Sequence, residues 1–172
     1  MAQKTQKDAT GIYEGTPEDA REAGQTSSSR PVSAVMTRNV EVVSPDAGLE
    51  ETAEKMRRLD VGVIPVCDGQ RLVGMITDRD ITIKIVAARR NPATAKVREA
   101  MNEGVVYCFD DQDVQEAAQL MADKQLRRLP ILNRDKRLVG IVSIGDVAAQ
   151  GDPGTAGHAL SGVARPGTQK PR

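Results

Sequence analysis

Apolar and polar positions in this chain follow a pattern that occurs twice. When Met36-Thr37 is set against Met101-Asn102, the two halves stay in register at an offset of 65 residues, which becomes 66 after one inserted residue in a later turn. The residues that match are Asp46 with Asp111, Leu49 with Val114, Ala53 with Ala118, Met56 with Met121, Pro65 with Pro130, Leu72 to Gly74 with Leu138 to Gly140, and Asp80 with Asp146. A match of this length indicates an internal repeat of one supersecondary unit.

Each copy of the repeat predicts five elements in the order βαββα. A short apolar strand is followed by a helix with apolar residues at steps of three and four, and we expect Asp46 and Asp111 to cap these helices. Two strands joined by a tight turn come next, and Asp68-Gly69 is typical of a hairpin turn. The predicted elements are first strands at 40–43 and 105–109, hairpin strands at 63–67, 71–77, 129–132 and 137–143, and second helices at about 78–88 and 144–150.

Composition divides the chain into four parts. Residues 1–30 are polar, contain glycine and proline, and end in Ser27-Ser28-Ser29, which is typical of a flexible N-terminal arm. Residues 31–90 hold the first repeat with a linking helix, and residues 91–150 hold the second repeat. Residues 151–172 are rich in glycine and proline and have no apolar period, so we predict a flexible C-terminal tail.

The predicted fold class is therefore α+β, with two βαββα repeats in tandem. Each small sheet leaves an apolar face that an identical neighbour can cover, so we expect the copies to pack about a pseudo-twofold axis. This packing predicts two related clefts between the repeats, and concave places of this kind are where small ligands bind.

Charge and aromatic content argue against several classes of function. With 24 basic and 24 acidic residues, no overall field attracts nucleic acid or an anionic membrane. Two Tyr, one Phe and no Trp are too few for a platform that stacks single-stranded bases. The chain contains neither a signal-peptide pattern nor a long apolar run, which predicts a cytoplasmic location without a membrane span.

Cysteine usage is equally sparse. Cys67 and Cys108 are too few for a disulfide framework and lack the spacing of a metal site. We interpret both as buried strand residues. The alternative, that one of them is oxidisable, depends on how exposed the two thiols are.

One chemical pattern, Gly-x-x-Thr/Ser-x-x-Asp, occurs in both copies where the last strand meets the second helix. A helix start offers free N–H groups and the positive end of the helix dipole, so a phosphate can bind there with Thr77 or Ser143. The acid one turn later, Asp80 or Asp146, can accept from both hydroxyls of a ribose. The same residues also form a helix capping box, in which the acid serves the helix itself. The sequence leaves both interpretations open.

A basic pair distinguishes the second copy. Arg127 and Arg128 stand directly before a predicted strand, where two guanidiniums can hold a di- or triphosphate. The alternative is that they are solvated or pair with helix acids. The first copy has Gly62-Val63 at this place, so the two clefts are not equivalent for a ligand that carries phosphate.

The chain shows no reaction centre. His158 is the only histidine and lies in the predicted tail, so a histidine-based triad or a histidine-rich metal site cannot be assembled. Neither a P-loop nor a dinucleotide fingerprint is present. We therefore predict a protein that is not an enzyme and requires no cofactor or metal.

Together these residues resemble the CBS (cystathionine beta-synthase) domain family over about residues 31–150. The segments that carry the resemblance are VSAVMTRNVEVVSPDAGLEETAEKM, VGVIPVCDGQRLVGMITDRDI, VREAMNEGVVYCFDDQDVQEAAQLM and RRLPILNRDKRLVGIVSIGDV. Through MITDRDITIK and NPATA, the chain also looks like the short stand-alone CBS pairs associated with hypoxic or stationary-phase stress.

The resemblance implies a Bateman module that binds AMP, ADP, ATP, NAD or S-adenosylmethionine and forms a homodimer. Members of the family use the repeated motif for phosphate and ribose, and adenylate-sensing members use the basic pair for phosphate. Carried onto this chain, the phosphate contacts are Thr77, Ser143, Arg127 and Arg128, the ribose contacts are Asp80 and Asp146, and the base pocket is Val40, Val42, Ile64, Val105, Tyr107 and Leu129.

The function that follows from the resemblance is regulatory signal transduction. An adenine nucleotide in the cleft between the repeats changes the state of the module and so the activity of an unidentified partner protein, provided that it prefers one state. The alternative is a stress-response interaction scaffold that binds no nucleotide, with a redox response through Cys67 or Cys108.

Overall fold

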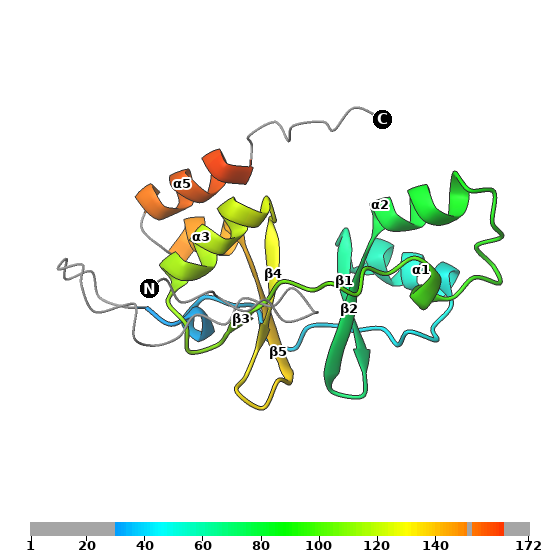
Figure 1. The fold of residues 1–172 in the computed structure, drawn as a ribbon, viewed down its shortest axis with the longest axis horizontal. Helices are drawn as coiled ribbons and strands as arrows, with labels where there is room; N and C mark the ends of the chain where they lie inside the picture. Colours follow the sequence, from blue (N-terminus) through cyan, green and yellow to red (C-terminus); the bar gives the residue numbers. More distant parts are fainter. Residues whose placement is uncertain (1–29, 151–152, 164–172) are drawn as a thin grey trace, which may run out of the picture. The chain divides into compact units, whose positions relative to one another are not determined.

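The computed structural model describes residues 30–150 and 153–163, and Figure 1 shows their helices and strands. These residues form two compact units, each of which combines helices with one small sheet, so the α+β fold class is confirmed. The predicted N-terminal arm, apart from Arg30, and the last nine residues of the predicted tail lie outside the described residues. Unit 1 comprises Val40–Val106 with Lys136–Leu138, and unit 2 comprises 30–39, Tyr107–Asp135, 139–150 and 153–163.

Unit 1 is built on a hairpin of β1 (Val63–Asp68) and β2 (Arg71–Thr77), which pair antiparallel. Gly69 in the turn has φ of 60°, a left-handed conformation that glycine adopts without steric cost, as the Asp-Gly pattern predicts. Helix α1 (Leu49–Leu59) packs on this hairpin through an apolar face at helical spacing.

The second helix of unit 1 changes type along its length. It begins as α2 (Asp78–Ile81) and continues as the π-helical segment η2 (Thr82–Val86). The Ala87 N–H donates to the carbonyl of Thr82, five residues back, over 2.9 Å. The predicted helix at 78–88 therefore has about the right extent, but its second half is wider than an α-helix.

Unit 2 repeats this arrangement. Strand β4 (Arg128–Leu132) lies between β3 (Cys108–Phe109) and β5 (Leu138–Ser143), and β3 runs parallel to β4. Helix α3 (Val114–Lys124) precedes the β4–β5 pair and α4 (Ile144–Gln150) follows it. The prediction of a second helix at 144–150 is confirmed.

The first strand of each copy is shorter than the sequence pattern predicts. At 40–43 only Val43 is paired, through hydrogen bonds of 3.1 Å to the Pro65 carbonyl and 2.9 Å from the Cys67 N–H. At 105–109 only Cys108–Phe109 forms a strand. An apolar run alone does not produce a strand, because each backbone group also needs a partner at its own register position.

The predicted helix caps at Asp46 and Asp111 are wrong by two residues. Helix α1 has Gly48 as its N-cap, without a side-chain hydrogen bond, and α3 has Asp113, whose carboxylate accepts from the Gln115 N–H over 2.7 Å. Asp46 and Asp111 lie in the preceding turns and form ion pairs with Arg98 and Arg134, at 2.5 and 2.9 Å. The cap is the last residue before the helical conformation, and the chain reaches that conformation one short turn later.

The opening segment of each repeat belongs to the unit formed mainly by the other repeat. At the start of the first repeat, η1 (Val32–Ala34) lies in unit 2, and Thr37 exchanges backbone hydrogen bonds of 2.8 and 3.0 Å with Ile141 of β5. In the opening segment of the second repeat, η3 (Val97–Glu99) lies in unit 1, and Asn102 exchanges bonds of 2.8 and 3.0 Å with Met75 of β2. The two units therefore do not coincide with two contiguous halves of the chain.

Part of the predicted C-terminal tail is helical. Helix α5 (Pro153–Val163) packs on α3 and α4 of unit 2, and Figure 1 shows it running beside α3. The sequence pattern missed this helix because its glycine and small residues carry little hydrophobic periodicity. Near its end, Gly162 lies in close contact with Ala122 of α3.

Each unit has its own aliphatic core. The buried residues of unit 1 are Val43, Leu49, Met56, Ile64, Val66, Ile76, Ile85, Ala95, Val97 and Ala100. Their counterparts in unit 2 include Val32, Val35, Val114, Ala117, Met121, Leu129, Ile131, Val142 and Val147. None of the helices in the described ranges is long and apolar enough to cross a bilayer.

Candidate functional site

The motif of unit 1 forms a complete capping box at the start of α2. Thr77 accepts from the Asp80 N–H over 3.0 Å, and its own N–H donates to Asp80 Oδ2 over 3.1 Å. The Thr77 hydroxyl also donates to Asp80 Oδ2, over 2.6 Å. The structure thus shows the helix-capping role of both residues.

Asp80 has two further partners in unit 1. Asn102 Nδ2 donates to Asp80 Oδ2 over 2.9 Å, and Lys84 Nζ lies 3.2 Å from Asp80 Oδ1. Burial acts to raise the pKa of Asp80, but the surrounding hydrogen bonds and the ammonium charge outweigh it, so this pKa lies below its ordinary value. Asp80 is therefore held in its charged form by neighbours within the protein.

The motif of unit 2 forms the same box with fewer partners. The Ser143 N–H and hydroxyl both donate to Asp146 Oδ2 over 2.7 Å, and the Asp146 N–H donates to the Ser143 hydroxyl over 3.1 Å. Within the described part of the chain, Asp146 takes part in no ion pair, and its Oδ1 accepts no hydrogen bond.

Close packing leaves no room for a side chain at the glycine of either motif. A Cβ on Gly74 would lie 3.0 Å from both the Asn102 carbonyl oxygen and Met101 Sδ, and a Cβ on Gly140 would lie 2.9 Å from the Thr37 carbonyl oxygen. In both units this glycine lets the segment from the other repeat cross the last strand. The whole motif thus has a structural role before any ligand is considered.

The basic pair lies at the same junction as the Ser143 motif. Arg127 and Arg128 are exposed where β4 begins, and the Ile144 N–H donates to the Arg127 carbonyl over 3.1 Å. This bond brings the backbone of Arg127 beside the residue that follows Ser143. In the described ranges neither guanidinium has a hydrogen bond or an ion pair with another side chain.

Unit 1 has the opposite charge at the matching place. The Asp78 N–H donates to the Gly62 carbonyl over 3.1 Å, and the Asp78 carboxylate lies 3.0 Å from where a Cβ on Gly62 would be. Where unit 2 presents two guanidiniums, unit 1 presents a carboxylate, which repels phosphate. The expected difference between the copies is thus also a difference in local charge.

The predicted base-pocket residues differ in exposure. Ile64 and Leu129 expose only 1% and 0% of their surface and belong to the cores of their units. The other four, Val40, Val42, Val105 and Tyr107, are partly exposed. The Tyr107 ring packs edge-on against Phe109, with centroids 5.5 Å apart.

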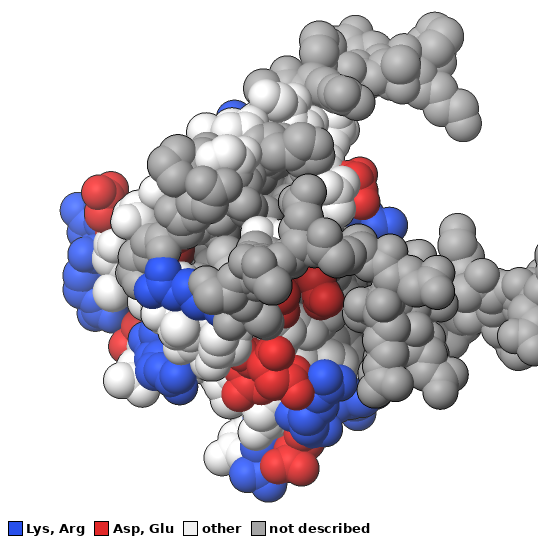
Figure 2. Space-filling view, turned by 90° about the vertical axis from the view of Figure 1, so that its left-hand side faces the viewer, with Lys and Arg blue, Asp and Glu red and all other residues white. Residues whose placement is uncertain are grey.

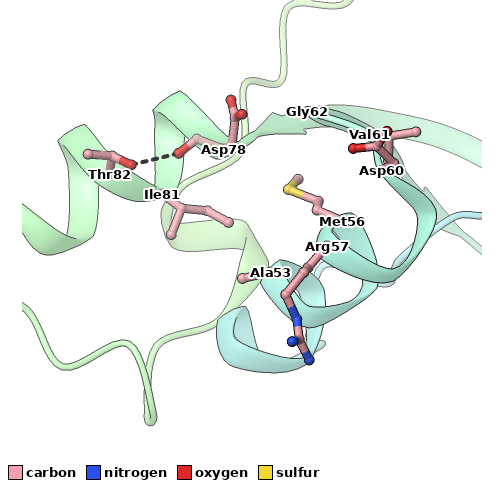
Figure 3. A pocket seen from close by; sticks show the side chains of 9 residues that line it. All are labelled: Ala53, Met56, Arg57, Asp60, Val61, Gly62, Asp78, Ile81 and Thr82. Atoms are coloured by element: carbon pink, nitrogen blue, oxygen red, sulfur yellow. Dashed lines mark hydrogen bonds between the residues drawn. The ribbon is translucent and has the colours of Figure 1, made fainter.

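A pocket of about 450 Å³ in unit 1 was not predicted from the sequence. It lies between the end of α1 and the start of α2, and Figure 3 shows Met56 and Ile81 pointing into it. None of the predicted site residues lines it, and only the glycine at position 62 hinted at open space here. Its lining is Ala53, Met56, Arg57, Asp60, Val61, Gly62, Asp78, Ile81 and Thr82.

Both cysteines are buried, as predicted. Cys67 exposes 5% and Cys108 exposes 2% of its surface. Burial raises the pKa of both thiols, and for Cys108 burial and the nearby Glu116 charge raise the pKa to about 12. Protonated, shielded thiols oxidise slowly, which argues against the redox alternative.

Charges are mixed on the face of the described residues that Figure 2 shows. Figure 2 shows small groups of Lys and Arg interspersed with Asp and Glu on the face in view, without a broad area of one sign. Within the ranges that the structure describes, no three His, Cys, Asp or Glu side chains gather closely enough to hold a metal ion.

The two units thus define a class of protein: a tandem pair of βαββα repeats, each with a capped Gly-x-x-Thr/Ser-x-x-Asp junction. The chain belongs to the CBS domain family, because the family model of the CBS domain matches residues 32–87 and 97–150. The resemblance drawn from the sequence is confirmed.

Two curated relatives are similar to most of the chain. The CBS domain-containing protein YhcV of Bacillus subtilis (strain 168) is 41% identical over 133 residues, which are 77% of this chain and 94% of the relative. Hypoxic response protein 1 of Mycobacterium tuberculosis (strain ATCC 25618 / H37Rv) is 39% identical over 115 residues, which are 66% of this chain and 80% of the relative.

Solved structures give the same result. The crystal structure of hypoxic response protein I with two coordinated zinc ions is 37% identical, with a TM-score of 0.65, and the match covers 70% of this chain and 98% of that one. The crystal structure of CBSX2 in complex with AMP is 24% identical, with a TM-score of 0.62, and the match covers 69% and 94%. The second likeness concerns the fold.

Proposed function

We propose that this chain is a regulatory module that binds an adenine nucleotide, signals its presence to a partner protein and catalyses no reaction. AMP, ADP, ATP, NAD and S-adenosylmethionine are the candidate ligands. The observation that carries the proposal is the junction in unit 2, where the exposed Arg127-Arg128 pair begins β4 beside the Ser143–Asp146 box.

Each part of a nucleotide has a suitable partner there. Guanidiniums bind phosphate oxygens with charge-assisted hydrogen bonds, and the Ser143 hydroxyl can add another. The Oδ1 atom of Asp146 can accept from a ribose hydroxyl while Oδ2 continues to cap the helix. The partly exposed Tyr107, which belongs to the same unit, can contact the base. CBSX2, which shares the fold, holds AMP.

Calorimetry with the five ligands and with adenosine tests the proposal. Arg127→Gln/Arg128→Gln is expected to weaken ADP and ATP by about tenfold to a hundredfold, since hydrogen bonds to charged groups contribute about 1.5–3 kcal/mol. Adenosine should be unaffected. Arg89→Gln/Arg90→Gln in unit 1 removes the same charge, costs one exposed ion pair with Glu99, and serves as the matched control. A wild-type chain that binds none of the ligands contradicts the proposal.

We also propose that the chain forms a homodimer through the helical surface of unit 1. Leu59, Ile83 and Val86 expose 37%, 53% and 57% of their surface there, whereas α5 packs over the corresponding helices of unit 2. The pocket rim carries both Arg57 and Asp60, so a twofold contact can pair one copy's cation with the other copy's anion.

The alternative function is an interaction scaffold that binds no nucleotide. The exposed apolar residues of unit 1 favour a protein contact in either case, and the similarity to hypoxic response protein 1 is compatible with a role in stress. The buried cysteines argue against the redox form of this alternative. Nucleotide calorimetry separates the two functions directly.

A further inference from the structure

Lys84 connects the second helix of unit 1 to the opening segment of the second repeat. Its ammonium donates to the carbonyls of Ala100 and Met101 over 2.7 and 3.3 Å and to Asn102 Oδ1 over 2.7 Å. It also lies 3.2 Å from Asp80 Oδ1. One cation thus ties the motif carboxylate to a segment more than fifteen residues away in sequence.

These contacts use the acceptor capacity that a ribose would need. Asp80 Oδ1 faces the Lys84 ammonium, and Oδ2 accepts from Thr77 and from Asn102 Nδ2. The Asp80 side chain is only 14% exposed. A ribose hydroxyl that donates to Asp80 must therefore compete with a charge-assisted contact that the folded protein already makes.

Unit 2 has neither of these residue types at the aligned positions. The repeat alignment places Thr37 where unit 1 has Asn102, and uncharged Gln150 where unit 1 has Lys84. The described contacts of Thr37 are backbone bonds to Ile141, not side-chain bonds to Asp146. Of the two motif acids, Asp146 alone keeps an unused carboxylate oxygen in the described part of the chain.

We propose that Lys84 and Asn102 occupy the first-copy acceptor Asp80 from within the protein, so that each chain binds a single nucleotide, at Asp146 in unit 2. This inference rests on the proposed function and names which of the two repeated motifs performs it. Asp80 is then a structural counter-ion for Lys84. The two copies of the motif thus share one sequence pattern, but the acid of the first copy stabilises the fold and the acid of the second copy binds the ligand.

The test compares Asp80→Asn with Asp146→Asn, two substitutions that remove the same charge at matching positions. In calorimetry we expect one nucleotide per wild-type chain, a loss of affinity of tenfold or more in Asp146→Asn, and a change of less than about twofold in Asp80→Asn. Two nucleotides per chain, or equal losses in the two variants, would overturn the inference.

Urea unfolding of Asp80→Asn, Lys84→Met and the double variant tests the pairing without any ligand. We expect each single change to lower the midpoint, and the double change to lower it by less than the sum of the two single losses. Both substitutions remove the Lys84–Asp80 interaction, whereas only Lys84→Met also removes the bonds to Ala100 and Met101. If the midpoint loss of the double variant equals the sum of the two single losses, the Lys84–Asp80 pairing is wrong, whichever ligand binds in calorimetry. If no ligand binds and the midpoints are non-additive, the proposed function fails while the Lys84–Asp80 pairing stands.

Discussion

Gly162 of α5 lies directly against Ala122 of α3. A Cβ on Gly162 would come within 2.8 Å of the Ala122 Cα, a separation that real side chains do not reach. The packing of α5 on unit 2 therefore depends on the absence of a side chain at this position.

Gly162→Ala is expected to destabilise the protein by about 1–3 kcal/mol, the usual cost of forcing an extra group into a packed contact. Urea unfolding measures it. Gly157→Ala in the same helix is the control, because nothing lies within 4 Å of its added Cβ and alanine favours helix by about 1 kcal/mol. Equal effects of the two substitutions would mean that α5 does not pack on α3 as described.

Gly140→Ala should destabilise unit 2, because the added Cβ would lie 2.9 Å from the Thr37 carbonyl and 3.0 Å from Met36 Cγ. The loss is again about 1–3 kcal/mol, read from the urea midpoint. Gly104→Ala in unit 1 is the matched control, because nothing lies within 4 Å of its added Cβ. An unaltered midpoint for Gly140→Ala would show that the opening segment of the first repeat, at Met36 and Thr37, is not held against β5.

Acid is expected to remove a stabilising contribution of Asp80. The folded-state pKa of Asp80 lies below the ordinary value of 3.8, so its contribution is complete above the unfolded-state pKa and disappears as the pH falls through the folded-state pKa. The difference in urea midpoint between the wild type and Asp80→Asn should be larger at pH 7 than at pH 3. The same difference at both pH values would contradict the charge pairing.

The thiols should be unreactive in the folded protein. A pKa raised from 9.0 to about 12 lowers the thiolate fraction of Cys108 near neutral pH by about a thousandfold. With a thiol-specific disulfide reagent we expect slow modification of the native protein and rapid modification of both cysteines after unfolding. Single Cys67→Ser and Cys108→Ser variants assign the rates. Rapid native modification would revive the redox alternative.

Ile83→Glu/Val86→Glu is expected to convert the proposed dimer to a monomer, since it places charges on the exposed apolar surface of unit 1. Light scattering coupled to size-exclusion chromatography measures the mass. Leu160→Glu on α5, where the wild-type leucine is 51% exposed, is the control and should leave the dimer intact. A dimer that survives the double change uses another surface.

Local signals in the sequence predicted much of the fold. The Thr77 and Ser143 junctions, the Asp68-Gly69 turn and the hairpin strands depend on residues a few positions apart, so their patterns can be read along the chain. The helix caps were misplaced because Asp46 and Gly48 lie in one short turn, and only the backbone conformation decides between them. Features that join residues far apart in the sequence, such as the Thr37–Ile141 pairing and the packing of α5 on α3, could not be predicted in this way.

The site shows the same division. The repeated motif and the basic pair were found because their residues are adjacent or in register between copies. The Lys84–Asn102 contact was not found, since nothing in a helical period links residues eighteen positions apart. The pocket beside Gly62 lies where some side chains are small, at Ala53 and Gly62. A sequence pattern shows which residues are present, but it does not show where the folded chain leaves a cavity between them.

Because the opening segment of the first repeat belongs to unit 2, the parts of the chain are expected to fold in a definite order during synthesis. Nearly all of unit 1 lies within residues 40–106, so it can begin to fold while the second repeat is still being made. Thr37 must wait for Ile141, a hundred residues later, before its backbone is paired. The segment at Thr37, which is synthesised early, is thus among the last described parts to form its native hydrogen bonds. If the ribosome stalls in the second repeat, the backbone of Thr37 stays unpaired.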